Sequence, residues 1–379
     1  MSGHLSRLDH LRFLAAGLVV VYHYSHWSLP QWSGSNPLVN LVREGHTGVA
    51  LFIVMSGFLF GVITYGKQIS YTQFIINRIV RIYPAYIFIL LVGAYFTRTS
   101  FGMQNILMCL LPFTNSYLPM LQNGQLAQLW TISIELQYYL IFPFILRFVR
   151  ITGLIYCLAL IGLATLMRAI VWEATGTVQD LAYWTIVGRI DQFMIGMMLA
   201  YAFKGERVKL GNPLWTLVSS AVLLTVIELF ALRGGFFAIG NPGSPYEAWW
   251  IVWPDIEGAS WGFVMMSYLM CRVRLPRPVD RAMSILGQVS YSIYLVHLIV
   301  IPAVMRLVPH PLAVWRDLQA NVLFTGALVV LPVVVAVAFA VHLVIERPFF
   351  SFKRAYILPT KPMPHELVPS VRLRRVGGD

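Results

Sequence analysis

Charged side chains are scarce in this sequence. Only 12% of its 379 residues are Asp, Glu, Lys or Arg, whereas 58% are hydrophobic. Soluble domains usually carry about 25% charged residues, and a soluble chain this apolar would expose large adhesive patches. The shortage excludes a disordered chain, a fibrous repeat and an ordinary soluble enzyme. It predicts a protein that crosses a membrane several times.

Cysteine is almost absent, and acidic residues are few. Cys109, Cys157 and Cys271 lie far apart in apolar segments, which provides neither a disulfide framework nor the spacing of metal ligands. No metal is therefore expected. The 28 Lys and Arg residues outnumber the 16 Asp and Glu residues, for a net charge of +12. Because the basic residues lie between apolar runs, they indicate membrane topology rather than nucleic-acid binding.

Ten apolar runs are long enough to cross a membrane as helices. They cover about 10–29, 47–65, 82–97, 129–149, 151–172, 183–203, 212–232, 249–271, 285–308 and 321–345. An eleventh run, about 104–118, is interrupted by Pro112 and Asn115 and is predicted to be re-entrant or interfacial. The predicted fold class is an all-α integral membrane protein with about ten transmembrane helices and one short non-spanning segment.

The distribution of positive charge orients these helices. If the N-terminus is cytoplasmic and 104–118 does not span, 21 of the 28 Lys and Arg residues fall on the cytoplasmic side. This agrees with the positive-inside rule, so both termini are predicted to be cytoplasmic. We expect a membrane domain over 1–350 and a basic cytoplasmic tail over 351–379, loosely ordered at the membrane surface.

Ionisable side chains inside apolar runs are costly and are functional candidates by default. Arg12 and His23 are 11 residues apart on the first predicted helix, which places them on one stripe about 16 Å apart. Arg12 would lie near the cytoplasmic interface and His23 in the outer half. Arg12 could instead be an interfacial anchor, His23 a hydrogen-bonded packing residue, and Asp9 a helix N-cap.

Three further residues are candidates beside this stripe. Arg78 and Arg81 share one helix face on the cytoplasmic side. They either fix the orientation of the helix in the membrane or form a clamp for phosphate groups. Glu135 is expected at roughly the depth of His23, where a carboxylate is costly unless it is paired. It could orient His23 and raise its basicity, or form a hydrogen bond between helices.

The other polar residues in the apolar runs have structural roles as their leading interpretation. Arg189 and Asp191 lie on the predicted outer side and could pair with other helices. Ser56 belongs to a segment of small residues that permits close helix packing. His297 is placed in the middle of the membrane, where a packed and hydrogen-bonded histidine is the simpler interpretation.

In their order and spacing, these residues resemble the acyltransferase 3 family of membrane acyltransferases, which includes O-antigen and exopolysaccharide O-acetyltransferases. The resemblance covers about residues 5–350. It rests on Leu8-Asp9-His10-Leu11-Arg12 with His23, Gly48 to Leu59, Asn77 to Pro84, Leu129 to Tyr139, Gly188-Arg189-Ile190-Asp191, Gly287 to Ser292 (with Ser290 and Tyr291) and Glu346-Arg347-Pro348. Two positions depart from the pattern: His10 stands where glycine is common, and Leu136 where a second acidic residue is often found.

The resemblance implies an O-acyltransferase of the bacterial cytoplasmic (inner) membrane. It would move an acyl group, most often acetyl, from acetyl-CoA or another cytosolic acyl-CoA to a hydroxyl of an extracytoplasmic or lipid-linked saccharide, without a metal. Arg12, Arg78 and Arg81 would hold the donor. His23, with Glu135, would act as a general base or carry the acyl group itself. Partners would be membrane lipid, the glycan acceptor and, as further candidates, a second copy of the chain or polysaccharide assembly proteins.

Two other classes of protein remain open from the sequence. A transporter or flippase with ten spans would also hold charges inside the membrane, but it would more often show broken helices in matching halves of an internal repeat, which is not evident here. A non-catalytic component of a polysaccharide assembly complex would not need the stripe formed by Arg12 and His23.

Overall fold

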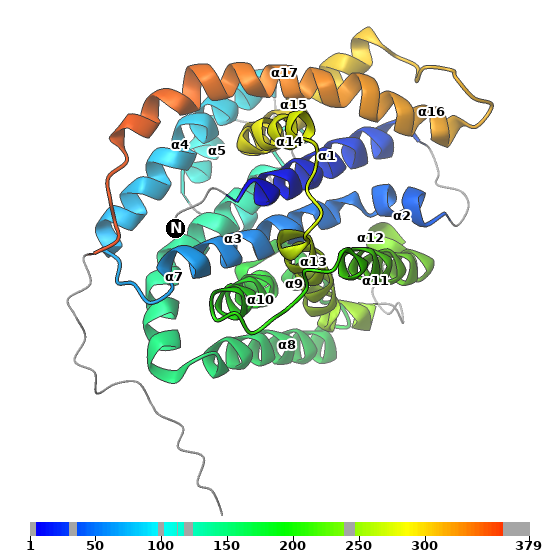
Figure 1. The fold of residues 1–379 in the computed structure, drawn as a ribbon. Coiled ribbons are helices and arrows are strands. Elements are labelled where there is room, and N and C mark those ends of the chain that lie inside the picture. The colour runs from blue at the N-terminus through cyan, green and yellow to red at the C-terminus, as the bar shows by residue number, and fades with distance from the viewer. Residues whose placement is uncertain are drawn as a thin grey trace, which may run out of the picture.

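The protein is a bundle of helices. The computed structural model describes residues 5–29, 36–97, 102–111, 113–116, 124–238 and 247–358 (Figure 1). Within these ranges the regular structure is helical, apart from an isolated β-bridge between Ile69 and Ile357. The all-α prediction is therefore confirmed for the described part of the chain.

The helices of the first half are α1 (Ser6–Ser28), α2 (Pro37–Arg43), η1 (Gly45–Thr47), α3 (Gly48–Thr64), α4 (Tyr71–Phe96), α5 (Met103–Cys109), η2 (Thr114–Ser116), α7 (Leu129–Thr152) and α8 (Ile155–Thr175). Those of the second half are α9 (Gln179–Trp184), α10 (Ile186–Lys204), α11 (Pro213–Leu232), α12 (Gly235–Ala238), η3 (Glu247–Ile251), α13 (Trp253–Met270), α14 (Arg277–Gln288), α15 (Ser290–Leu307), α16 (Leu318–Thr325), η4 (Gly326–Val330), α17 (Leu331–Val341), η5 (His342–Glu346) and η6 (Arg347–Phe352).

Eight helices in the described part of the chain are long and apolar enough to cross a membrane. They match eight of the ten predicted runs. In this number, η1 and α3 together count as one helix, and so do the continuous elements from α16 to η6. The other two runs form α1 and α13, which are not among these eight helices and hold polar residues such as Asp9 and Arg12 in α1 and Asp255 and Glu257 in α13. The structure thus supports a multi-span membrane protein.

The interrupted run at 104–118 does not form a long helix. Its described part consists of α5, with seven residues, and η2, with three. At about 1.5 Å per residue, α5 is roughly 10 Å long, far short of the ~30 Å of a bilayer core. The described part of this run thus contains no helix long enough to span, as the prediction requires.

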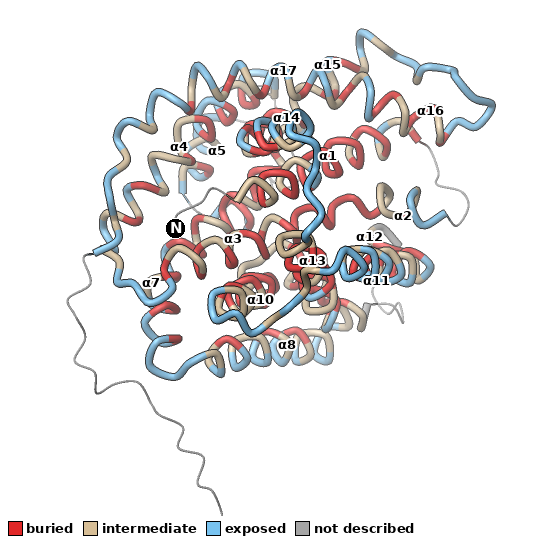
Figure 2. Tube along the Cα trace, in the orientation of Figure 1, coloured by how far each residue is buried: buried red, intermediate tan, exposed pale blue. Residues whose placement is uncertain are grey.

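Helices α1 and α3 lie at the centre of the bundle, and most of their residues are buried (Figure 2). Glycine allows α3 to pack closely against α10. A Cβ atom at Gly57 would lie 2.1 Å from the carbonyl oxygen of Phe193, and one at Gly196 would lie 2.1 Å from that of Val54. Larger residues would push the helices apart, so the small residues here serve close packing as the sequence suggested.

Buried ion pairs join α8, α10 and α13. Arg168 of α8 donates to Asp191 of α10 at 2.6 Å and to Asp255 of α13 at 2.7 Å. Arg189 of α10 donates to Glu257 of α13 at 3.1 Å. Inside a bilayer, such charges persist only when they are paired with one another or with other polar groups. The structure therefore places both Arg189 and Asp191 in bonds between helices.

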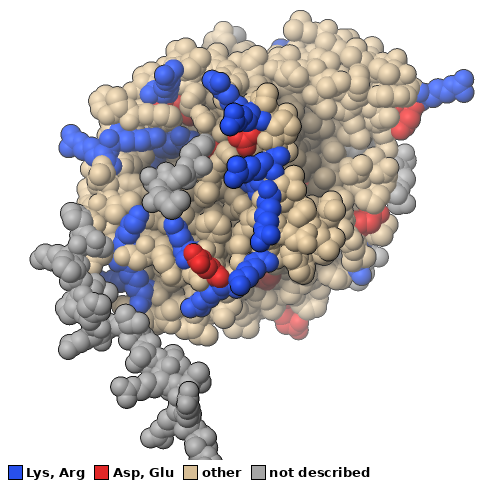
Figure 3. Space-filling model, in the orientation of Figure 1, with Lys and Arg blue, Asp and Glu red and all other residues tan. Residues whose placement is uncertain are grey.

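Basic side chains gather on one face of the molecule. Figure 3 shows Lys and Arg around the start of α1 and over the connections that face the viewer. Exposed basic residues here are Lys204 at the end of α10, Arg207 and Lys209 between α10 and α11, and Arg272 and Arg274 between α13 and α14. This is the face that the positive-inside rule predicts to be cytoplasmic.

Candidate active site

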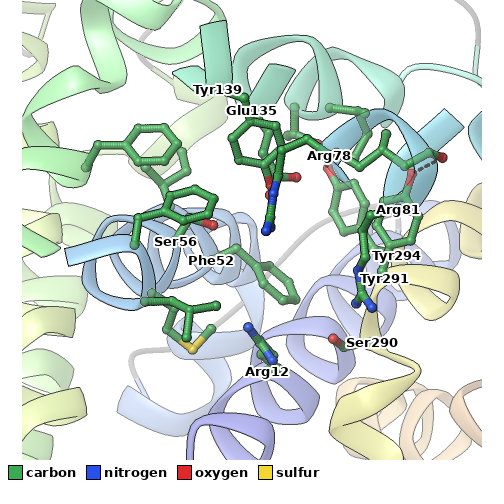
Figure 4. Close-up of a pocket in the computed structure, with 18 of the residues that line it drawn as sticks. Arg12, Phe52, Ser56, Arg78, Arg81, Glu135, Tyr139, Ser290, Tyr291 and Tyr294 are labelled. Atoms are coloured by element: carbon green, nitrogen blue, oxygen red, sulfur yellow. Dashed lines mark hydrogen bonds between the residues drawn. The ribbon is translucent and has the colours of Figure 1, made fainter. Parts of the chain in front are cut away.

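A cavity of about 350 Å³ opens between α1, α3, α4, α7 and α15 (Figure 4). Three arginines from two helices line its wall: Arg12 from α1, and Arg78 and Arg81 from α4. Lys353, which directly follows η6, adds a fourth basic side chain. The cavity is large enough for a small ligand or for part of a larger one.

Three of these four cations form no close ion pair. Among the described residues, no carboxylate lies within ion-pair distance of Arg78, Arg81 or Lys353, and the buried Nε of Arg78 has no hydrogen-bond partner. Aromatic rings surround them instead: the Arg78 guanidinium lies 5.1 Å from the centre of the Phe60 ring. The four cations outnumber the nearby carboxylates of Glu135, which lines the cavity, and Asp9, which pairs with Arg12. An excess of positive charge in a partly buried cavity favours an anionic ligand, and arginine forks suit phosphate.

Arg12 is held in place by Asp9, one turn earlier in α1. Its Nη1 donates to Oδ1 of Asp9 at 3.0 Å, and Asp9 also accepts from Ser284 of α14 at 3.2 Å. Asp9 lies inside the first turns of α1, whose N-cap is Leu5. The N-cap interpretation of Asp9 is therefore wrong, and this carboxylate links Arg12 to α14.

Glu135 lies beside the arginines and does not contact His23. It lines the cavity, accepts a hydrogen bond from Tyr139, and is close enough to Arg78 and Arg81 to interact with their charges. The prediction of a His23–Glu135 pair assumed that α7 begins near the outer surface. Instead Gln128, just before α7, donates to the Leu295 carbonyl in the first half of α15 at 2.8 Å. Seven residues farther along, Glu135 is roughly 10 Å nearer the arginines.

His23 contacts a second histidine instead. Its ring centre lies 4.9 Å from that of His297 on α15. The Nδ1 of His23 donates to the Val19 carbonyl at 2.9 Å, and the Nδ1 of His297 donates to the Tyr294 carbonyl. A ring that donates through Nδ1 keeps the lone pair of Nε2 free in its neutral form. His23 therefore has the tautomer that a general base requires.

The cavity reaches toward these histidines through α7 and α15. Thr131 of α7 and Tyr294 of α15 both line the cavity, and the Thr131 hydroxyl donates to the Tyr294 hydroxyl at 3.0 Å. The Tyr294 ring centre lies 5.4 Å from that of His297. Contacts thus run from the arginine end of the site (Arg12, Arg78 and Arg81) to its histidine end (His23 and His297).

The remaining predicted residues divide into two groups. Ser56, Ser290 and Tyr291 line the cavity, and the Tyr291 hydroxyl donates to the Ile82 carbonyl at 2.9 Å. Arg189 and Asp191 take part in the buried ion pairs and do not line the cavity. No group of three or more His, Cys, Asp or Glu residues is arranged to hold a metal ion in the ranges described.

Sequence reasoning missed three residues of the site. Tyr139 and Tyr294 are aromatic residues in apolar runs, and their pattern is indistinguishable from ordinary packing. The sequence predicts Lys353 only as part of the basic tail over 351–379. A signal was present for Tyr139, because it follows Glu135 by four residues and so faces the same side of a helix.

Comparisons with known proteins identify the family of the chain. The model of a family described as "Acyltransferase domain" matches residues 5–341. The O-acetyltransferase OatA of Staphylococcus aureus is 22% identical over 331 residues, which cover 78% of this chain and 50% of OatA. The protein BcsY of Komagataeibacter xylinus, provisionally named a membrane-bound transacylase, is 26% identical over 76% of this chain and 71% of its own.

An uncharacterized protein of Haemophilus influenzae is 29% identical over 47% of this chain and 86% of its own. The chain spans half the length of OatA, so the resemblance concerns only that half. No solved structure matches the chain. The family match covers nearly all of the helical bundle, including both ends of the site, and the chain belongs to the acyltransferase 3 family of membrane acyltransferases.

Proposed function

We propose that the protein transfers an acetyl group from acetyl-CoA to a hydroxyl group of a saccharide on the opposite face of the bacterial cytoplasmic membrane. The observation that carries this proposal is the arrangement of α1. Arg12, near its start, faces a cavity lined by three further cations, and His23, near its end, has a free Nε2. Both residues belong to one helix that lies at the centre of the bundle (Figure 1).

The arginine end fits the phosphates of CoA. Four cations around one cavity would neutralise much of the charge of a nucleotide pyrophosphate and phosphate. The cavity is too small for the whole of CoA, so the nucleotide would remain at the mouth while the pantetheine arm extends inward. Arg12 and His23 are about 16 Å apart along α1, a distance similar to the length of that arm. The thioester would then approach His23.

The chemistry would take place at the histidine end. Nε2 of His23 would accept the proton of the acceptor hydroxyl as its oxygen attacks the thioester carbonyl carbon. When the carbon–sulfur bond breaks, the leaving thiolate would take the same proton from His23. Val19 would keep the imidazole in the required tautomer through Nδ1. His297 would hold the ring in place by packing against it. A covalent acyl-histidine at His23 is the competing pathway.

Glu135 would act at the arginine end, since it does not contact His23. Its carboxylate lies among Arg12, Arg78 and Arg81, where it can fix the orientation of their guanidinium groups before the donor arrives. Tyr139 holds the carboxylate through its hydroxyl. Glu135 is thus proposed as a positioning residue for the donor site. Its substitution should weaken donor binding and leave the pH dependence of transfer, which His23 would set, unchanged.

Replacing Arg78 tests the donor site. Arg78→Ala should weaken acetyl-CoA binding about 10- to 100-fold, because a charge-assisted hydrogen bond contributes about 1.5–3 kcal/mol. The measurement is the dissociation constant of the purified protein in nanodiscs for CoA. Arg147→Ala serves as the control, because this exposed arginine of α7 does not line the cavity. An unchanged affinity in Arg78→Ala would contradict the assignment of the clamp.

A further inference from the structure

The segment that follows the last helix is bound to the start of α4. The backbone N–H of Ser70 donates to the Tyr356 carbonyl at 2.8 Å, and that of Leu358 donates to the Gln68 carbonyl at 2.9 Å. These bonds accompany the bridge between Ile69 and Ile357. Figure 1 shows the segment passing beside the first turns of α4. We call residues 353–358 the strap.

Asn77 of α4 fixes the other end of the strap. Its side-chain amide donates to the Arg354 carbonyl at 2.6 Å, and its side-chain oxygen accepts from the Arg354 backbone N–H at 3.1 Å. Asn77 is buried. One side chain thereby satisfies both backbone groups of one strap residue, as a neighbouring strand would. Asn77 thus holds the backbone of Arg354, which is the residue directly after Lys353.

The strap completes the wall of the cavity. The Nζ of Lys353 lies 3.5 Å from the centre of the Phe350 ring, and the Arg81 guanidinium lies 5.2 Å from the same ring. The ring of Tyr356 lies 5.7 Å from the Arg78 guanidinium. The strap thus adds one cation to the cavity and brings an aromatic ring against a second cation, both on the side formed by α4.

From this geometry we propose that the strap is part of the donor site and that Lys353 binds a phosphate group of the acyl-CoA. The inference rests on the proposed function, since it names a further residue for the same ligand. It also assigns a role to Asn77, which positions Lys353 without touching the donor. Residues 353–358 are then a functional part of the membrane domain, and the proposed boundary at 350 is too early.

The charge of Lys353 responds to pH in an accessible range. Burial, and the nearby charges of Arg81 and Arg78, lower the pKa of Lys353 to about 8, and the carboxylate of Glu346 opposes them. The other ionisable groups that line the same cavity are Arg12, Glu135, Tyr139, Tyr291 and Tyr294, and Tyr356 of the strap lies beside Arg78. Lys353 is therefore mostly protonated at pH 7 and mostly neutral at pH 9. Its contribution to phosphate binding should decline as the pH rises through 8.

Comparing CoA with pantetheine tests this role, because pantetheine has the same arm without the phosphates. In nanodiscs of phosphatidylcholine, Lys353→Ala should weaken CoA binding about tenfold or more and leave pantetheine binding unchanged.

Wild-type affinity for CoA should fall between pH 7 and pH 9, whereas Lys353→Arg, which stays charged, should not show that fall. Arg354→Ala is the matched control, because Arg354 is the next residue in the chain and its side chain is exposed.

Two truncations test the strap as a whole. A chain ending at Leu358 should bind CoA like the full chain, and one ending at Phe352 should lose affinity for CoA but keep it for pantetheine. Asn77→Leu should resemble the shorter chain. The inference is wrong if Lys353→Ala binds CoA as tightly as wild type, or if it weakens CoA and pantetheine equally. If wild type itself binds no CoA, the proposed function fails instead.

Discussion

His23→Ala should slow acyl transfer strongly while leaving the donor site intact. General-base catalysis by a histidine typically contributes about 10²–10⁴-fold to a rate, so the rate of transfer should fall by that factor. CoA affinity should stay within about twofold, because His23 does not line the cavity of the arginines. The measurement is the transfer of labelled acetyl groups from acetyl-CoA to saccharide in membranes with matched protein levels.

The matched control for His23 is its neighbour His26. Both residues belong to the last turns of α1, and both donate through Nδ1 to the carbonyl four residues earlier. Only His23 contacts His297. His26→Ala should therefore retain most of the activity. Transfer at the wild-type rate in His23→Ala would refute the catalytic assignment, and equal losses in the two variants would show that the effect is not specific to His23.

Replacing Arg168 should destabilise the bundle strongly. Arg168→Met leaves the carboxylates of Asp191 and Asp255 close together and without the cation that both contact at about 2.7 Å or less. Removing one partner of a buried ion pair costs about 3–5 kcal/mol. We expect a marked drop in the thermal unfolding midpoint of the detergent-solubilised protein, measured by intrinsic tryptophan fluorescence.

Neutralising the two carboxylates distinguishes charge from packing. If the cost arises from unpaired charge, Arg168→Met combined with Asp191→Asn and Asp255→Asn should recover part of the lost stability. Arg147→Met, at an exposed position of α7, should have little effect. A triple variant that is less stable than Arg168→Met would contradict the electrostatic explanation and point to the hydrogen bonds that Arg168 donates to the carbonyls of Gly188 and Ile251.

The sequence was sufficient to predict those features that depend on local periodicity and composition. The apolar runs correspond to the long helices, and the interruption at Pro112 and Asn115 corresponds to a segment too short to span. The spacing of Arg12 and His23 predicts two positions about 16 Å apart along one helix, because an unbroken helix fixes the rise per residue, and both residues belong to α1. Arg78 and Arg81 likewise lie on one face of α4.

Contacts between helices were harder to predict. The position of Glu135 depends on where α7 begins relative to α15, and in the structure Gln128, just before α7, is hydrogen-bonded to Leu295 of α15. The hydrophobicity of the run does not predict this contact. The contact between His23 and His297 depends on how α1 and α15 pack, across 274 positions of sequence. A single sequence contains no periodic signal for such a contact. The two histidines were therefore predicted as separate candidates.

The strap illustrates a third kind of difference. Its composition is basic and lacks a helical pattern, so it resembled the start of a loosely ordered tail. The part of 351–379 that the structure describes ends at 358 and is bound to α4 by backbone hydrogen bonds. Backbone pairing of this kind requires few special side chains, apart from Asn77, and leaves almost no trace in composition. The rest of the predicted tail lies outside the described residues.

The central claim is that donor and acceptor meet from opposite faces of the membrane, with the donor entering at the arginine end. Labelled acetyl-CoA, which does not cross the membrane, can be added to sealed native vesicles of known and opposite orientation. We predict label on luminal saccharide only in vesicles that expose the face of Arg78 and Arg81, and none with His23→Ala. Equal labelling in both orientations, or label confined to saccharide on the donor's own side, would contradict the account.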